Sequence, residues 1–207
     1  MDKSTDYHRS VRNYVDSSHT PLLLETAMSR LNIPTVETAP SASKPLLEAV
    51  RLQLGSVPNL FRLIAISPAA LEGFLGLSGA LGKTLDARTR ERIAIAVAQV
   101  NGCDYCLSAH TYLGASLAKL DDSELAQNRV GRSNDPKADV AVRFAVKVAE
   151  TRGKVSEADV AELKLAGFSE TDIVDVISTV ALNVLTNFLN NVAQTDIDFP
   201  VVQTKAA

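Results

Sequence analysis

Cysteine is scarce in this chain of 207 residues, which has only two cysteines and three histidines. Proline is scarce over most of the length, because Pro136 is the sole proline between Ala69 and Phe199. We find no strand-like alternation of apolar and polar residues of useful length and no glycine-rich phosphate loop. These absences exclude a mainly β fold and a nucleotide site built on such a loop.

Charge of one sign and long apolar runs are also lacking. The formal net charge is −3 and the isoelectric point is about 5.6, whereas general nucleic-acid binding usually needs a basic surface. No apolar run approaches the roughly 20 residues that span a bilayer, and the polar N-terminal segment has no apolar signal-peptide core. We therefore expect a cytoplasmic protein without nucleic-acid or membrane partners.

The distribution of helix-favouring residues predicts an all-α fold. The interval from Ala69 to Phe199 is rich in Ala, Leu, Val and Ile at helical spacing. Helix starts are indicated by capping residues, some of them followed by proline or by an acidic residue three positions later. These starts are Ser67-Pro68, Asp86, Asp122, Asp135-Pro136, Ser156 with Asp159, and Ser169 with Asp172.

The expected helices cover most of the chain and have short connections, which favours an antiparallel helical bundle. They span 21–31, 46–54, 59–66, 68–81, 87–100, 103–118, 122–130 and 136–151, with one helix after Ser156 and a last helix over 170–193. We expect an arm and connector over 1–44, a helical domain over 45–195 and an irregular tail over 196–207.

Both cysteines and one histidine lie in the segment NGCDYCLSAH, residues 101–110. A C-x-x-C motif in a reducing compartment is more often catalytic or metal-binding than structural. On a helix, Cys103, Cys106 and His110 fall within an arc of about 60°, so their side chains contact each other. Cα atoms three residues apart are also within the range that a reversible disulfide tolerates.

The preceding helix supplies a carboxylate. If the two helices form an antiparallel hairpin about Gly102, residues equidistant from the turn face each other. Glu91 then faces a position near Leu113, one helical turn from His110, so that its carboxylate can contact the imidazole. The imidazole can also contact the Cys106 thiol. This line of carboxylate, imidazole and thiol has the logic of an orienting group, a base and a nucleophile.

Two other interpretations of the motif remain open. The cysteines could be two small core residues of an apolar helix, or two Cys, one His and one Glu could bind zinc. Against zinc, ligands at i, i+3 and i+7 on one rigid helix do not easily surround a tetrahedral ion, and His8 and His19 lie in the arm. We therefore expect no metal and no other cofactor.

The pattern E-x11-C-x-Y-C-x3-H, formed by Glu91, Cys103, Tyr105, Cys106 and His110, resembles the active-site signature of the alkyl hydroperoxidase D-like, carboxymuconolactone decarboxylase superfamily. The preceding residues, SPAALEGFLGLSGALGKTLDARTRERIAIAVAQV, are similar to the family core. The segment NVLTNFLNNVA is similar to the C-terminal helix of the peroxidase-related branch. The resemblance covers residues 45–195 and implies the family's helical fold, whereas the decarboxylase branch lacks the cysteine pair and its chemistry is not implied.

The resemblance implies a thiol-dependent peroxidase that reduces organic hydroperoxides or hydrogen peroxide. Cys106 would attack the peroxide, and Cys103 would resolve the resulting sulfenic acid to a disulfide. Glu91 would act as base and pass a proton through His110. A lipoyl-bearing or thioredoxin-like dithiol partner would regenerate the thiols, and the family implies a trimeric or hexameric homo-oligomer. Tyr105 departs from the histidine of the founding peroxidase, which shortens the proton relay.

The residues alone give conflicting indications about which thiol is more acidic. Cys103 lies nearer the helix start, where free N–H groups and the dipole lower a thiol pKa. His110 lies one turn from Cys106, and a positioned base has the larger effect, so we expect Cys106 to attack. The same pair would also suit a dithiol–disulfide oxidoreductase or a redox sensor without peroxide turnover, and unreactive cysteines would suit a helical binding module.

The last helix carries a polar stripe on an otherwise apolar sequence. The stripe consists of Asn183, Asn187, Asn190 and Asn191. Buried amides need partners, and inter-helix hydrogen bonds are favoured here over the lining of a substrate pocket. The apolar segments LFRLIAI and DIVDVISTVALNVLTNFL exceed what one modest core needs, which predicts a homo-oligomer.

Overall fold

The computed structural model describes residues 29–205 and shows an all-α fold with no strand among these residues. The helices are α1 Lys44–Leu54, α2 Asn59–Ile64, α3 Pro68–Leu81, α4 Ala87–Val100, α5 Asp104–Ser116, α6 Asp122–Arg129, α7 Pro136–Thr151, α8 Glu157–Leu165 and α9 Glu170–Ala193. The expected helix over 21–31 falls mainly on residues outside those described, and residues 29–31 are not helical.

The helix starts follow the capping pattern of the sequence. The side chains of Ser67, Asp86 and Asp135 each accept a backbone N–H at the start of their helices. Both expected capping boxes are present, at the starts of α8 and α9. The cap of α6 is Asp121 rather than the expected Asp122, because its side chain accepts the N–H of Glu124.

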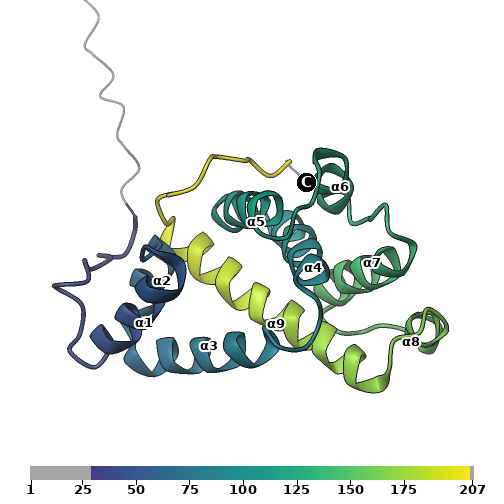
Figure 1. The fold of residues 1–207 in the computed structure, drawn as a ribbon, viewed down its shortest axis with the longest axis horizontal. Helices are drawn as coiled ribbons and strands as arrows, with labels where there is room; N and C mark the ends of the chain where they lie inside the picture. The colour runs from purple at the N-terminus through teal and green to yellow at the C-terminus, as the bar shows by residue number, and fades with distance from the viewer. Residues whose placement is uncertain (1–28, 206–207) are drawn as a thin grey trace, which may run out of the picture.

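Helix α9 crosses the middle of the molecule, with α1–α3 on one side and α6–α8 on the other (Figure 1). Helix α4 packs against α5, α6, α7 and α9. One apolar cluster joins α4, α7, α8 and α9 and includes Val97, Leu163 and Val176. Another lies under α1–α3 and includes Leu47 and Leu71. The first cluster joins α4 to α9, and the second packs against Leu182 and Leu189 of α9.

The chain after α9 is irregular, as expected, and it packs on the helices. It runs in extended form from the end of α9 past α5 to α6 (Figure 1). Ile197, Phe199 and Val202 pack against an apolar cluster that contains both cysteines. We call residues 195–205 the C-terminal strap.

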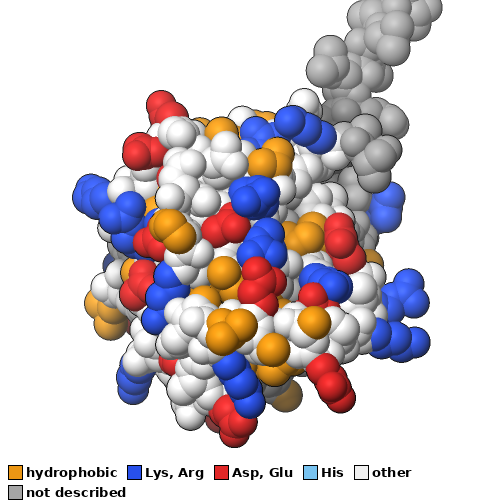
Figure 2. All heavy atoms as spheres, turned by 90° about the vertical axis from the view of Figure 1, so that its right-hand side faces the viewer, with side chains coloured by type: hydrophobic (Ala, Val, Ile, Leu, Met, Phe, Trp, Pro, Cys, Tyr) orange, Lys and Arg blue, Asp and Glu red, His pale blue; other side chains and the backbone are white. Residues whose placement is uncertain are grey.

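The face formed by the right-hand side of Figure 1 has charges of both signs interspersed with apolar side chains (Figure 2). This mixture is typical of a solvated protein surface.

Candidate active site

A tight turn between α4 and α5 brings the predicted site residues together. Gly102 has a φ of +59°, a left-handed conformation that glycine adopts without steric cost. The N–H of Cys103 then donates to the carbonyl of Ala98 at 3.0 Å. The turn therefore reverses the chain, and α5 packs along α4.

The hairpin pairs Glu91 with His110. Glu91 Oε2 lies 2.8 Å from His110 Nδ1, and the His110 and Glu91 side chains are 24% and 20% exposed. Counting outward from Gly102 predicts this pair, and the structure contains it. The imidazole is thus oriented by a carboxylate, as expected for a histidine that handles protons.

Cys103 lies outside the helix in which the sequence places it. It is the N-cap of α5, with φ −103° and ψ 96°, and its sulfur accepts the backbone N–H of Cys106 at 3.4 Å. An N-cap residue accepts a hydrogen bond from the first turn of its helix, and here a thiol takes this position. Both cysteines are free and buried.

The two thiols differ in acidity. A hydrogen bond from Cys103 and, to a smaller extent, the charge of His110 and the amide of Asn190 lower the pKa of Cys106 to about 6, despite the opposing effect of burial. The pKa of Cys103 is raised by the same hydrogen bond and by burial. Cys103 therefore stays a thiol and donates to a Cys106 thiolate at neutral pH.

The Glu91 carboxylate keeps His110 protonated over a wider pH range. Burial lowers the pKa of His110, but the charge and the hydrogen bond of Glu91, together with the charge of Cys106, outweigh burial and raise the pKa. The imidazolium of His110 and the thiolate of Cys106 both lie on α5, and α4 supplies the Glu91 carboxylate. The arrangement can supply a nucleophile and a proton donor at the same place.

Helix α9 contributes contacts to Cys106 that sequence reasoning missed. Asn190 Nδ2 donates to Cys106 Sγ at 3.3 Å, and Thr186 Oγ1 lies 3.9 Å from the same sulfur. The asparagine stripe was the available signal, and the expected inter-helix hydrogen bonds are present at three of its four residues. Asn191 Nδ2 donates to the carbonyl of Asn101 at 2.9 Å, Asn187 Oδ1 accepts from Asn101 Nδ2 at 2.8 Å, and the bond of Asn190 also crosses from α9 to α5. What the sequence did not indicate is that one of these bonds ends on the sulfur of Cys106.

Tyr105 points away from the proton relay and toward the C-terminal strap. Its hydroxyl donates to Asp198 Oδ1 at 2.8 Å and accepts the N–H of Leu60 at 3.1 Å. Its ring meets the Phe199 ring edge-on, with centroids 5.9 Å apart. The residue between the cysteines therefore fastens the strap over the apolar cluster that contains the thiols.

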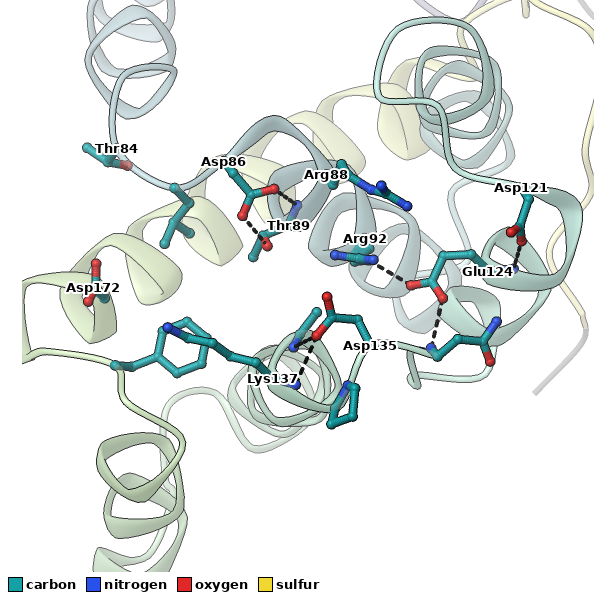
Figure 3. A pocket seen from close by; sticks show the side chains of 15 residues that line it. Thr84, Asp86, Arg88, Thr89, Arg92, Asp121, Glu124, Asp135, Lys137 and Asp172 are labelled. Carbon is teal, nitrogen blue, oxygen red and sulfur yellow. Dashed lines mark hydrogen bonds and ion pairs between the residues drawn. The ribbon is translucent and has the colours of Figure 1, made fainter.

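A cavity of about 780 Å³ lies elsewhere, at the start of α4 and α7 (Figure 3). Several of its charged groups are engaged with one another or with helix ends: Arg92 Nε donates to Glu124 Oε1 at 2.6 Å, and Asp86 and Asp135 cap their helices. The cavity contains no cysteine or histidine. The reactive groups therefore place the candidate site at the α4–α5 hairpin.

Within residues 29–205, no group of three or more His, Cys, Asp or Glu side chains is arranged to hold a metal ion. Cys103, Cys106, His110 and Glu91 instead form two separate contacts, a thiol–thiol pair and an imidazole–carboxylate pair. The arrangement is suited to thiol chemistry.

Comparison with known proteins identifies a family domain. Residues 68–147 match the carboxymuconolactone decarboxylase family. A segment of 45 residues, 21% of this chain, is 49% identical to an uncharacterized protein of Haemophilus influenzae, and this match spans only 40% of that protein.

Solved structures extend the similarity to most of the chain. An alkylhydroperoxidase AhpD core protein of Ralstonia eutropha JMP134, described as peroxidase-related, has 26% identity and a TM-score of 0.74, with 83% of this chain and 93% of that chain covered. A peroxidase-related protein of Silicibacter sp. TM1040 has 26% identity and a TM-score of 0.69 over 82% and 92% of the chains.

The debrominase Bmp8 has the same fold, with 18% identity and a TM-score of 0.65 over 84% of this chain and 92% of that chain. Its name shows that this fold also serves other reactions.

Proposed function

Because the chain belongs to the alkyl hydroperoxidase D-like, carboxymuconolactone decarboxylase superfamily, we propose that it is a thiol-dependent peroxidase for organic hydroperoxides or hydrogen peroxide. The observation that carries the proposal is the setting of the Cys106 sulfur, which accepts a hydrogen bond from Asn190 and lies beside Cys103, so that its pKa is lowered. The thiolate is the nucleophilic form of cysteine. Cys103 adjoins it as a resolving thiol, and the Glu91–His110 pair adjoins it as a proton donor.

The reaction begins with attack of the Cys106 thiolate on a peroxide oxygen. The S–O bond forms as the O–O bond breaks, the sulfur loses two electrons, and the leaving alkoxide or hydroxide takes a proton from His110. The products are a Cys106 sulfenic acid and an alcohol or water. Glu91 orients His110 and stabilises its charged form before the transfer.

Cys103 completes the oxidative half of the cycle. Its sulfur attacks the sulfenic sulfur, a disulfide forms, and the hydroxyl leaves as water after taking the thiol proton. An external dithiol of lipoyl or thioredoxin-like type then reduces the disulfide. A reducing compartment such as the cytoplasm would keep that partner reduced.

Peroxide consumption with dithiothreitol as reductant tests the proposal. We expect turnover of tert-butyl hydroperoxide by the wild-type chain and no turnover by Cys106→Ser. With peroxide in the absence of dithiothreitol, Cys103→Ser should form one sulfenic acid per chain and no intramolecular disulfide. Undiminished consumption by the Cys106→Ser variant would overturn the assignment.

A second candidate is a dithiol–disulfide oxidoreductase or redox sensor. It is favoured by the burial of both thiols, since Cys103 and Cys106 are 0% and 2% exposed, so that a peroxide must enter a covered site. Stopped-flow mixing with hydrogen peroxide separates the two functions. Thiol loss slower than that of free cysteine would support the second candidate.

We also propose that the protein associates with further copies of itself through α9. The helix has an exposed apolar stripe along its whole length, formed by Val174, Ile177, Ala181, Leu185, Phe188 and Val192. Steps of three and four residues match the spacing by which helices pair. A second copy offers the same stripe, and such self-complementary contacts are typical of homo-oligomers.

A further inference from the structure

Three buried polar side chains of α9 converge on the sulfur of Cys106. Asn190 Nδ2 donates to this sulfur at 3.3 Å, and Thr186 Oγ1 lies 3.9 Å away. Asn187 follows Thr186 in α9, and its Oδ1 accepts from Asn101 Nδ2, two residues before Cys103. Thr186, Asn187 and Asn190 are 5%, 0% and 3% exposed, so these groups form a buried polar face beside the nucleophile.

The hydrogen bonds of the two amides fix their orientation. Asn101 Nδ2 donates to Asn187 Oδ1 at 2.8 Å, which directs Asn187 Nδ2 away from the turn. Asn190 uses its Nδ2 on the Cys106 sulfur, which leaves its Oδ1 for another donor. Each amide thus has one atom engaged and one atom free.

The free atoms have no hydrogen-bond partner among residues 29–205. Asn187 Nδ2 is a buried donor and Asn190 Oδ1 is a buried acceptor, and neither is paired there. The other asparagines of the stripe do engage their amide nitrogens, Asn183 with Thr179 and Asn191 with Asn101. Burying an unpaired polar atom costs free energy, and such an atom in a native site calls for a functional explanation.

We propose that Asn187 and Asn190 bind the peroxide oxygen that Cys106 attacks and then hold the same oxygen in the sulfenic acid. A hydroperoxide ends in an O–H group, which both accepts and donates a hydrogen bond. Asn187 Nδ2 would donate to this oxygen, and Asn190 Oδ1 would accept its proton. One unpaired donor and one unpaired acceptor beside the sulfur match this group. The inference rests on the peroxidase proposal and adds two catalytic residues to it.

The oxygen stays between the amides as the reaction proceeds. Before attack it is the terminal oxygen of ROOH; the S–O bond then forms, the O–O bond breaks, and RO⁻ leaves with the proton of His110. The sulfur is oxidised by two electrons, and the terminal oxygen keeps its hydrogen as Cys106–S–OH. Retention by the amides orients the sulfenic acid for attack by Cys103, which releases the oxygen as water.

This site predicts a substrate class. Hydrogen peroxide and alkyl hydroperoxides both carry the terminal O–H, whereas a dialkyl peroxide and a disulfide do not. The amides should therefore accelerate attack on hydroperoxides and leave attack on a disulfide unchanged.

The test compares two electrophiles in the full-length chain. Rates of Cys106 with tert-butyl hydroperoxide and with 2,2′-dithiodipyridine are measured by stopped flow for wild type, Asn187→Leu and Asn187→Asp. Each rate is corrected for the thiolate fraction, which is taken from the pH dependence of alkylation. The Asp variant keeps the oxygen that accepts from Asn101, so it removes the donor and retains that inter-helix hydrogen bond.

We expect both variants to lose about 100-fold in the hydroperoxide rate, the order found when one preorganised donor is removed from a reacting oxygen. Their dithiodipyridine rates should equal that of wild type. Asn183→Leu is the matched control, because Asn183 is buried on the same helix and its amide nitrogen donates to the Thr179 carbonyl rather than to Cys106. It should leave both rates unchanged.

Three other outcomes of the rate measurements would overturn the amide site. Equal hydroperoxide rates in wild type and both variants would overturn the amide site and leave the peroxidase proposal intact. An equal loss in both rates would assign Asn187 a structural role and also overturn the amide site. A wild-type chain that fails to react with hydroperoxide would overturn the peroxidase proposal, and the amide site with it.

Discussion

At the scale of single residues, the acidity of Cys106 depends first on its neighbour Cys103. The hydrogen bond from Cys103 is the largest cause of the lowered pKa of Cys106, about 6. In Cys103→Ala we expect this pKa to rise toward the usual thiol value of about 8.5, so that the thiolate fraction at pH 7 falls below the roughly 90% that a pKa of about 6 gives. Absorbance of the thiolate at 240 nm against pH measures the change.

The Cys103→Ser variant is the control for this prediction, since its hydroxyl can still donate to the Cys106 sulfur. It should show a smaller rise in the pKa of Cys106 than Cys103→Ala. An unchanged midpoint in Cys103→Ala would show that the neighbour does not set the acidity of Cys106.

Glu91 acts on Cys106 through His110. Its charge raises the pKa of His110, and the imidazolium in turn lowers the pKa of Cys106. In Glu91→Gln the pKa of His110 should fall and that of Cys106 should rise. A thiolate is present above its pKa, so the pH profile of iodoacetamide alkylation should shift by about one unit to higher pH.

Glu72→Gln is a matched control for Glu91→Gln, because Glu72 is an exposed glutamate on α3 outside the site. Its alkylation profile should coincide with that of wild type. If the Glu91→Gln profile also coincides, the carboxylate does not contribute to thiolate formation.

At the scale of elements, local chemistry accounts for most of the helices. The capping residues Ser67, Asp86 and Asp135 determine where α3, α4 and α7 start, because their side chains satisfy N–H groups of the first turn. The Glu91–His110 pair was predictable for the same local reason, since a short turn sets the register of α4 against α5. The start of each of these helices, and the register of α4 against α5, are thus determined by residues that are close in the sequence.

The missed features depend on contacts between distant segments. Asn190 reaches Cys106 across 84 sequence positions, and the rotation of α9 that allows this is set by packing against α3, α4, α5 and α7. The placement of Cys103 outside α5 was missed because residues 101–103 form the hairpin turn, which ends in a non-helical N-cap. No spacing rule in the sequence specifies either feature.

The C-terminal strap is an element that limits access to the thiols. Asp198 fastens it, because Tyr105 and the N–H of Asn59 both donate to its carboxylate at 2.8 Å. In Asp198→Ala we expect native-state alkylation of the cysteines to accelerate about tenfold or more, since each lost hydrogen bond to a charged group contributes about 1.5–3 kcal/mol. Iodoacetamide labelling followed by mass spectrometry measures the rate.

Asp196→Ala is the control for the strap, because the bond from Asn59 goes to the backbone carbonyl of Asp196, which the variant keeps. It should label at the wild-type rate. Equal labelling of Asp198→Ala and wild type would show that the strap does not limit access.

At the scale of the whole molecule, α9 has to satisfy three environments at once. It is long and apolar enough to cross a membrane by length and composition alone, with 39% of its most apolar window buried. One face, with Val176 and Val180, lies in the core, and Asn190 faces Cys106. The remaining face is the exposed apolar stripe, for which we propose a second copy of the chain as partner.

A charge in this stripe should therefore dissociate the oligomer. Phe188 is the largest side chain of the stripe and is 56% exposed. In a symmetric pair each copy contributes Phe188, so Phe188→Glu removes two apolar contacts of about 1.5–3 kcal/mol each and weakens association about 100-fold or more. Multi-angle light scattering at micromolar concentration should show an oligomer for wild type and a monomer for Phe188→Glu.

Leu117→Glu is the control, because Leu117 at the end of α5 is 71% exposed and lies outside the stripe. It should scatter as wild type does, and a monomeric wild-type chain, or an oligomeric Phe188→Glu chain, would contradict the pairing through α9.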